Sequence, residues 1–359
     1  MIHLLINLWT RAMNRSLLYS ILLAALMMVV VPSSLAQQVT PDTEVATEKL
    51  GQTGMKFLTT SLDARATALG GAVTADETFS GSMALFYNPS AMARMDGQFS
   101  VGFGITQFIA DINYNAFSVA YQPQGGNYGV FGLSVMSVDY GDIIQTVRAD
   151  NEAGFEDIGT FAPSGLSVGL GYARSFTDRF SVGTQFKLVT QDFGTQPIND
   201  SGTSRSFDIS TVAVDFGVLY NTGFRSLVLG MSARNFSKEL VYVSQSFELP
   251  LSFQIGLAMD MIDFTSLDPN MHSFNLNVEA SRPRDFQEHI KVGGEYTFMN
   301  LLSLRAGLGQ AFVQDEEQGV SLGAGLNFDV SNVNLKADYS FTDFGVFDSV
   351  NRFSIALGF

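Results

Sequence analysis

Apolar and polar side chains alternate through most of the chain that follows residue 96. Between Phe180 and Leu188, for example, Phe, Val and Leu alternate with Ser, Gly, Gln and Lys. A period of two is typical of a β-strand with one apolar and one polar face. Clusters of Gly, Asn, Asp and Pro divide the pattern into segments of roughly ten residues. We count fourteen segments, centred near Val101, Phe117, Leu133, Leu170, Phe186, Val214, Leu229, Ile255, Leu276, Val292, Leu304, Leu322, Leu335 and Ile355.

These segments predict an all-β fold, a transmembrane antiparallel β-barrel of about 14 strands over residues 96–359. An even number of strands places both termini on one side, and the longer connections then belong to the outer face. Short turns such as Thr177-Asp178 and Met299-Asn300 belong to the periplasmic face, where Asp260 to His272 is the one long exception. The longer connections lie at about 140–164, 194–206, 237–250, 312–318 and 342–349.

The two alternating sets of side chains should face different surroundings. Inside a bilayer only a closed sheet pairs every backbone group, so the apolar set faces lipid and the other set faces the lumen. The lumen set is polar in most strands, and an apolar conduit is not evident in it. We expect its charged members to pair with one another or with the N-terminal segment: Lys187, Glu279, Lys291, Glu295, Arg305, Lys336 and Asp338.

A soluble β-sandwich would also show alternation, but the last segment argues against it. Apolar residues at every second position lead from Phe353 to Phe359, on which the sequence stops. This ending resembles the terminal strand by which bacterial outer-membrane barrels are recognised for assembly. The resemblance implies that Phe359 is an assembly signal, and that outer-membrane lipid and the barrel-assembly machinery are partners.

The start of the chain predicts export from the cytoplasm. Arg11 and Arg15 precede an almost wholly apolar run, and Ser34-Leu35-Ala36 supplies small residues for cleavage. We therefore expect a secretory signal peptide over 1–36. Its positively charged region lies unusually far from residue 1, so Met13 is an alternative site for the start of translation. A transmembrane anchor would need about 20 apolar residues, and this run has about 15.

The next two stretches differ in kind. Residues 37–53 are polar and aperiodic, which predicts a flexible periplasmic lead-in. Residues 54–95 predict two short helices, the second with Asn88 as N-cap and Pro89 at its first position. We expect 54–95 to fold inside the barrel as a helical plug. Buried there, Arg65 would need a lumen carboxylate as partner, such as Glu279, Glu295 or Asp338.

The first of these helices has clear local signals at both ends. Apolar residues recur at helical spacing from Leu62 to Leu69. Ser61 or Asp63 can cap its start, and Gly70-Gly71 supplies a left-handed stop.

The same stretch holds several short motifs: Gly54, Phe57-Leu58, Asp63-Ala64-Arg65-Ala66, Leu69-Gly70-Gly71-Ala72 and Ala84-Leu85-Phe86-Tyr87-Asn88-Pro89. Together they resemble the opening of the PorV/PorQ family, outer-membrane barrels associated with type IX secretion. The Phe-Tyr-Asn-Pro piece is also similar to the FadL family of outer-membrane hydrocarbon transporters. The resemblance implies that the motif residues form the plug of such a barrel: Phe57, Leu58, Asp63, Arg65, Gly70, Gly71, Tyr87, Asn88 and Pro89.

Composition favours a membrane barrel over a soluble enzyme. Charged residues make up 15% of the chain, against roughly 25% in soluble domains. The formal net charge of −15 argues against nucleic acid as a partner. The chain has no cysteine, which excludes disulfides, thiolate metal sites and cysteine nucleophiles.

Candidate catalytic motifs lack their expected context. The stretches 165–169 (GLSVG) and 319–323 (GVSLG) match a nucleophile elbow around Ser167 and Ser321, but both continue as plain alternation. His272 in a predicted turn and His289 at a strand start do not form a base or a metal site together. Asp315-Glu316-Glu317 could hold a divalent cation only weakly. We expect no enzyme, no cofactor and no metal.

Two functions follow as hypotheses. The first, implied by the PorV/PorQ resemblance, is a barrel in the bacterial outer membrane that binds or shuttles exported cargo together with type IX secretion components. Its binding surface would be the loop 140–164, which carries Ile143, Ile144, Phe155, Ile158 and Phe161. The alternative is a FadL-like channel for hydrophobic solutes, gated by 54–95.

Overall fold

The computed structural model describes residues 52–197, 204–311, 319–331 and 333–359. The predicted signal peptide over 1–36, the lead-in up to residue 51 and the cluster Asp315-Glu316-Glu317 lie outside the described residues. They stay predictions.

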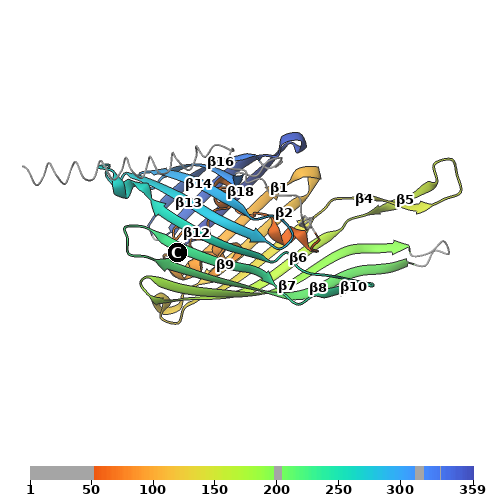
Figure 1. Ribbon diagram of the computed structural model, residues 1–359, viewed down its shortest axis with the longest axis horizontal. Helices are drawn as coiled ribbons and strands as arrows, with labels where there is room; N and C mark the ends of the chain where they lie inside the picture. Colours follow the sequence, from red (N-terminus) through yellow and green to blue (C-terminus); the bar gives the residue numbers. More distant parts are fainter. Residues whose placement is uncertain (1–51, 198–203, 312–318, 332) are drawn as a thin grey trace, which may run out of the picture. The chain divides into compact units, whose positions relative to one another are not determined.

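Fourteen antiparallel strands close into one barrel (Figure 1). Neighbours in the ring follow chain order, and β1 closes it against β18 with Ser100 opposite Gly358. Each of the fourteen predicted centres falls within a strand, so the predicted barrel is confirmed. The strands are β1 (Phe99–Gln107), β2 (Asn113–Tyr121), β3 (Val130–Asp139), β6 (Ser164–Thr177), β7 (Phe180–Pro197), β8 (Ser204–Asn221), β9 (Val228–Phe236), β12 (Ser252–Asp260), β13 (His272–Pro283), β14 (His289–Phe298), β15 (Leu302–Ala311), β16 (Val320–Val330), β17 (Val333–Asp343) and β18 (Ser349–Gly358).

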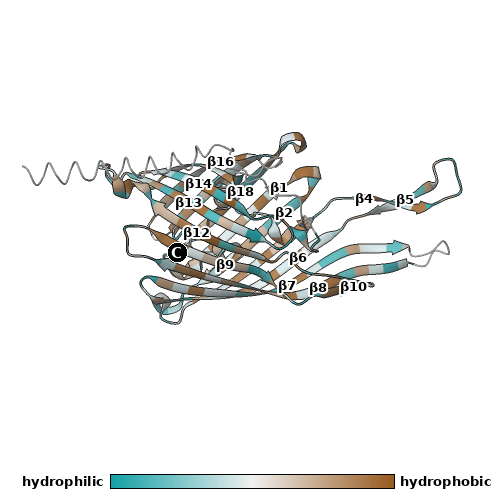
Figure 2. Cartoon of the chain, viewed as in Figure 1, coloured by the Kyte–Doolittle hydropathy of each residue, from teal (hydrophilic) through white to brown (hydrophobic). Residues whose placement is uncertain are grey.

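The two faces of the sheet carry the two predicted sets of side chains. On β7, Phe186 and Leu188 are 57% and 55% exposed, whereas Lys187 between them is 7% exposed. Figure 2 shows the same alternation of hydrophobic and hydrophilic residues along the barrel strands. A bilayer accounts for an outer surface with so many exposed apolar side chains, because water would make it costly.

Several predicted loops contain more strand than expected. The stretch 140–164 holds a separate two-stranded sheet, and 237–250 holds another. At 194–197 and 204–206 the barrel hairpin itself continues, with Thr195 opposite Ser206. The alternating pattern runs on beyond the lipid-facing belt, and strands can still pair there in water. The extra strands are β4 (Ile143–Arg148), β5 (Phe155–Phe161), β10 (Leu240–Tyr242) and β11 (Gln245–Phe247).

Short helices lie in two places. One set forms the N-terminal segment, which we define as residues 52–98: η2 (Lys56–Thr59), α2 (Ala64–Ala68), η3 (Ser82–Phe86) and η4 (Pro89–Arg94). Single turns in the connections make up the other: η5 (Ile109–Asp111), η6 (Pro123–Gly126), η7 (Met261–Phe264) and η8 (Gly345–Phe347). None of the helices in the described part of the chain is long and apolar enough to cross a membrane. His272, predicted in a turn, is instead the first residue of β13.

The N-terminal segment runs through the barrel from one end to the other. We call the end with β4–β5, β10–β11 and the connection 284–288 the loop end, and the end with Phe359 the turn end. At the loop end the Gly54 backbone N–H donates to Glu248 O at 3.1 Å. At the turn end the Gln98 N–H donates to Phe359 O at 2.5 Å.

This path corrects one prediction. Residues 52–53 were expected in a periplasmic lead-in, on the same side as the C-terminus. They lie instead at the loop end, because the contacts of Gly54 and Lys56 are with the connections of that end. Local sequence signals do not encode which end of a barrel a segment enters.

Candidate functional site

The lumen is filled by the N-terminal segment, and local signals shape its helix as predicted. Asp63 is the N-cap of α2, and its carboxylate accepts from Ala66 N at 2.9 Å. Gly70 and Gly71 have φ of 65° and 77°. Their N–H groups donate to Thr67 O and Ala66 O at 2.9 and 2.8 Å, which is the Schellman pattern of a helix end.

The Asn88-Pro89 pair starts η4 as predicted and also ties it to the barrel wall. The Asn88 side-chain oxygen accepts from Ser90 N at 3.1 Å, and its amide donates to Thr74 O at 2.7 Å and Val218 O at 3.2 Å. A side chain at Gly217 would occupy the place of the Asn88 amide, so β8 needs a glycine there. Pro89 likewise packs against the backbone of β7 at Gly183.

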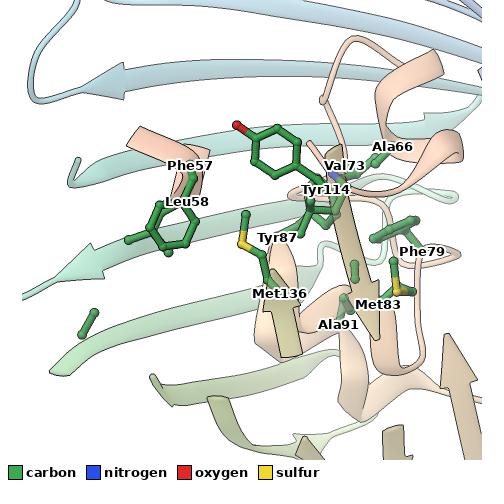
Figure 3. Packing of buried hydrophobic residues seen from close by; sticks show 14 of the residues in the cluster. Phe57, Leu58, Ala66, Val73, Phe79, Met83, Tyr87, Ala91, Tyr114 and Met136 are labelled. Carbon is green, nitrogen blue, oxygen red and sulfur yellow. The ribbon is translucent and has the colours of Figure 1, made fainter. Parts of the chain in front are cut away.

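Tyr87 joins the two halves of the N-terminal segment. Its hydroxyl accepts from the N–H groups of Leu62 and Asp63 at 3.1 and 3.0 Å. Its ring meets Phe79 edge-on, with centroids 5.2 Å apart. Phe57 and Leu58 are 1% and 3% exposed. Figure 3 shows these side chains with Tyr114 of β2 and Met136 of β3, so segment and wall share one apolar core.

Arg65 has the lumen carboxylate that the sequence predicted. Its Nε and Nη2 donate to the two oxygens of Glu295 on β14 at 2.9 and 2.8 Å. Nη2 also lies 3.0 Å from Asp76 Oδ2. Glu295 is shared with Arg305, which reaches Asp338 at 2.6 Å. A buried bidentate ion pair of this kind neutralises the charge of Arg65 and also holds its side chain in one position.

The other predicted lumen charges also form pairs, with one exception. Lys187 lies 2.8 Å from Asp215, and Lys291 lies 2.8 Å from Glu279. Glu279 in turn accepts from Thr74 N at 3.1 Å, another bond between wall and segment. Among the described residues, Lys336 alone of the predicted set has no ion pair.

An apolar cavity of about 530 Å³ lies at the loop end, and we call it the mouth cavity. It is bounded by the N-terminal segment, the barrel wall and the two hairpins β4–β5 and β10–β11. Its polar side chains are neutral except for Lys56. Burial raises the pKa of Tyr140 to about 12, so its hydroxyl stays protonated. The lining residues are Gly54, Met55, Lys56, Tyr140, Ile143, Phe161, Pro163, Gln191, Phe193, Ile209, Tyr242 and Phe247.

The sequence did not predict this cavity, since the lumen set showed no apolar stretch. Its apolar surface comes mostly from connections and strand extensions. Ile143 and Phe161 had been singled out as apolar residues of an outer loop. Ile143 is indeed 43% exposed, and both residues also line the cavity. The signal available was a group of aromatic residues near the loop end: Phe161 and Phe247 in two connections and Phe193 in β7.

Lys56 is held at the edge of the mouth cavity by the connection 284–288. Its Nζ lies 2.5 Å from Asp285 Oδ2, which also accepts from Thr53 Oγ1 at 2.5 Å. Nζ is 4.5 Å from the centre of the Phe286 ring. Burial alone would raise the pKa of Asp285, but the hydrogen bonds from Lys56 and Thr53 hold it below the usual range.

The remaining predicted positions lie in regular structure. Phe359 pairs with Phe99 at the turn end, where its N–H donates to Phe99 O at 2.9 Å and its side chain is 46% exposed. Ser167 and Ser321 are buried near the starts of β6 and β16, as the fourth and second residues of these strands, without the strand-to-helix turn of a nucleophile elbow. No group of three or more His, Asp or Glu among the described residues could hold a metal ion.

Comparisons with known proteins bear on the fold. No protein-family model and no curated protein matches the sequence. The Pseudomonas putida toluene transporter TodX is similar in structure, with a TM-score of 0.53 and 15% identity over 82% of this chain and 96% of its own. The CymD monoaromatic hydrocarbon channel has a TM-score of 0.50 and 12% identity over 83% of this chain and 96% of its own.

Identities this low show the fold alone. The chain has the FadL-like fourteen-stranded barrel fold of outer-membrane proteins. Its apolar outer surface agrees with the predicted location in the bacterial outer membrane. These neighbours are a transporter and a channel, not enzymes. Membership of the PorV/PorQ family stays a prediction.

Proposed function

We propose that the chain takes up hydrophobic small molecules across the outer membrane and binds them first in the mouth cavity. The observation that carries this proposal is the cavity itself, which is concave, largely apolar and lined by five aromatic side chains. Its volume of about 530 Å³ is within the range of small-molecule sites. The similarity in fold to a toluene transporter and a monoaromatic hydrocarbon channel supports the same function.

The lumen between the mouth cavity and the turn end is closed, which bears on how transport could occur. It is filled by the N-terminal segment, whose Arg65 and Asn88 are bonded to the wall. A ligand in the mouth cavity therefore has no open path through the barrel, and passage requires the segment to move. We propose that the N-terminal segment is the gate, which is the role that the FadL-like alternative gave to residues 54–95.

Filling the cavity tests this function. Ile209 lines the mouth cavity, whereas Val212 on the same strand is 56% exposed on the outer face. We expect Ile209→Trp to lower the binding and uptake of toluene and Val212→Trp to leave both unchanged. Toluene binding that survives Ile209→Trp undiminished would contradict the proposal.

Protein binding at the cell surface is the second candidate function. The β4–β5 hairpin favours it, because Ile144 and Phe155 are 62% and 50% exposed outside the lipid-facing belt. This is the surface that the PorV/PorQ resemblance assigned to secreted cargo and type IX components. The role requires proteins with type IX sorting domains in the same genome, and their absence would eliminate it.

A further inference from the structure

We propose that the mouth cavity selects uncharged ligands over carboxylates and that Asp285 is the residue that sets this selectivity. The inference rests on the proposed function, since it assumes that the cavity binds a ligand. It concerns the chemistry of the ligand, which the fold does not determine.

Lys56 is the one charged residue in the lining of the mouth cavity as described, and its charge is already satisfied. Its Nζ lies 2.5 Å from Asp285 Oδ2 and 4.5 Å from the Phe286 ring centre. The Asp285 side chain is 2% exposed and the Lys56 side chain 39% exposed, so water screens the pair from the Lys56 side only. A carboxylate that entered the cavity would have to compete with a fixed internal anion for the same ammonium group.

The surroundings add negative charge. A polar groove of about 260 Å³ adjoins the cavity at Phe247, and its charged residues are Glu239, Glu248, Arg284 and Asp285. Arg284 is also taken, because its Nη1 lies 2.8 Å from Glu248 Oε2. The Asp285 Oδ1 atom is buried and has no hydrogen-bond partner among the described residues. Asp285 lines this groove and not the mouth cavity, so it acts on a ligand there through its negative charge, which opposes an anion.

The cavity is better equipped for an uncharged molecule. Its other polar side chains are Tyr140, Gln191 and Tyr242, which can bond a hydroxyl group without a charge. The Phe193 and Tyr242 rings lie 5.6 Å apart and offer faces to an apolar or aromatic body. We therefore assign the site to neutral hydrophobic compounds, with or without one hydroxyl group.

The test compares 1-decanol with decanoate, which differ in charge but little in size. Binding is measured at pH 8 by calorimetry with the full protein in lipid nanodiscs, because detergent would occupy the cavity. We expect decanol to bind at least about tenfold more tightly than decanoate, a difference of about 1.4 kcal/mol. In Asp285→Asn, decanoate should gain about tenfold while decanol stays unchanged.

Two further variants make the result specific. Glu288→Gln removes an acid from the same connection, but Glu288 is 62% exposed and paired with Arg282, so neither ligand should be affected. The double variant Lys56→Met with Asp285→Asn removes both charges, and the gain for decanoate should disappear.

Three outcomes would overturn the inference. If decanoate binds the unmodified protein as tightly as decanol, the selectivity is absent although the proposed function stands. Equal changes for both ligands in Asp285→Asn would mean that Asp285 merely holds the N-terminal segment in place. If neither ligand nor toluene binds, the proposed function itself fails.

Discussion

At the scale of single residues, Arg65 joins the barrel wall to two other residues of the N-terminal segment. Its guanidinium joins Glu295 on β14 to Asp76 and Thr78 of the N-terminal segment. Arg65→Met would leave two buried carboxylates short of a partner, which costs about 3–5 kcal/mol for a buried pair. We expect the free energy of unfolding, measured by denaturant titration in lipid vesicles, to fall by that amount.

Arg282→Met is the matched control, because Arg282 and Glu288 are 69% and 62% exposed. An exposed pair contributes less than about 1 kcal/mol. If the two variants lost equal stability, the lumen network would be no stronger than a surface ion pair.

We predict that Phe359 matters more for assembly than for the folded state, as the resemblance of the last strand implies. Its side chain is 46% exposed at the turn end, and its backbone adds one pairing to β1. Deleting Phe359 should lower the yield of heat-modifiable barrel in the outer membrane, whereas Phe359→Tyr should keep it. Normal membrane levels without Phe359 would show that the terminal strand is not read as an assembly signal.

At the scale of elements, the β4–β5 hairpin separates the two candidate functions. Deleting 143–160 should leave the barrel folded, because β3 and β6 pair directly from Val130–Ala173 to Asp139–Ser164. It removes Ile143 from the mouth cavity, so we expect weaker toluene binding and unchanged protein secretion. Ile144→Asn, exposed and outside the cavity, should affect neither. Lost secretion with intact toluene binding would favour the protein-binding role.

The same elements show what the sequence could predict. Strands were recoverable because lipid on one face and a polar lumen on the other impose a period of two, and α2 was recoverable because Asp63 and Gly70 are local caps. The expected pairing of Arg65 followed from the cost of burying a lone charge. The mouth cavity was not recoverable, since Gly54, Phe161 and Phe247 meet only through tertiary packing. The entry of the segment at the loop end depends on Glu248 and Asp285, far along the chain.

At the scale of the whole molecule, the barrel is a shell around a segment that crosses it from end to end. Apolar contacts, the Arg65 network and the Asn88 bonds attach that segment to the wall at several depths. The proposed gating would therefore require part of these attachments to be released. The loop end is the part where release is least costly, because Lys56 is half-exposed there whereas Arg65 is buried.

The direction of the segment gives the last prediction. Gln52 is exposed at the loop end and Gln98 is exposed at the turn end. Because the protein has no cysteine, single-cysteine variants can be labelled cleanly on intact cells with a 5 kDa polyethylene glycol maleimide, a reagent too large for porins. With the loop end outside, as its longer connections indicate, Gln52→Cys should be labelled and Gln98→Cys should react only after the outer membrane is opened. Ile144→Cys, at a site 62% exposed, reports that the loop end is accessible. If Ile144→Cys and Gln98→Cys were labelled on intact cells but Gln52→Cys was not, the segment would run in the opposite direction. It would then not form the wall of the mouth cavity described here.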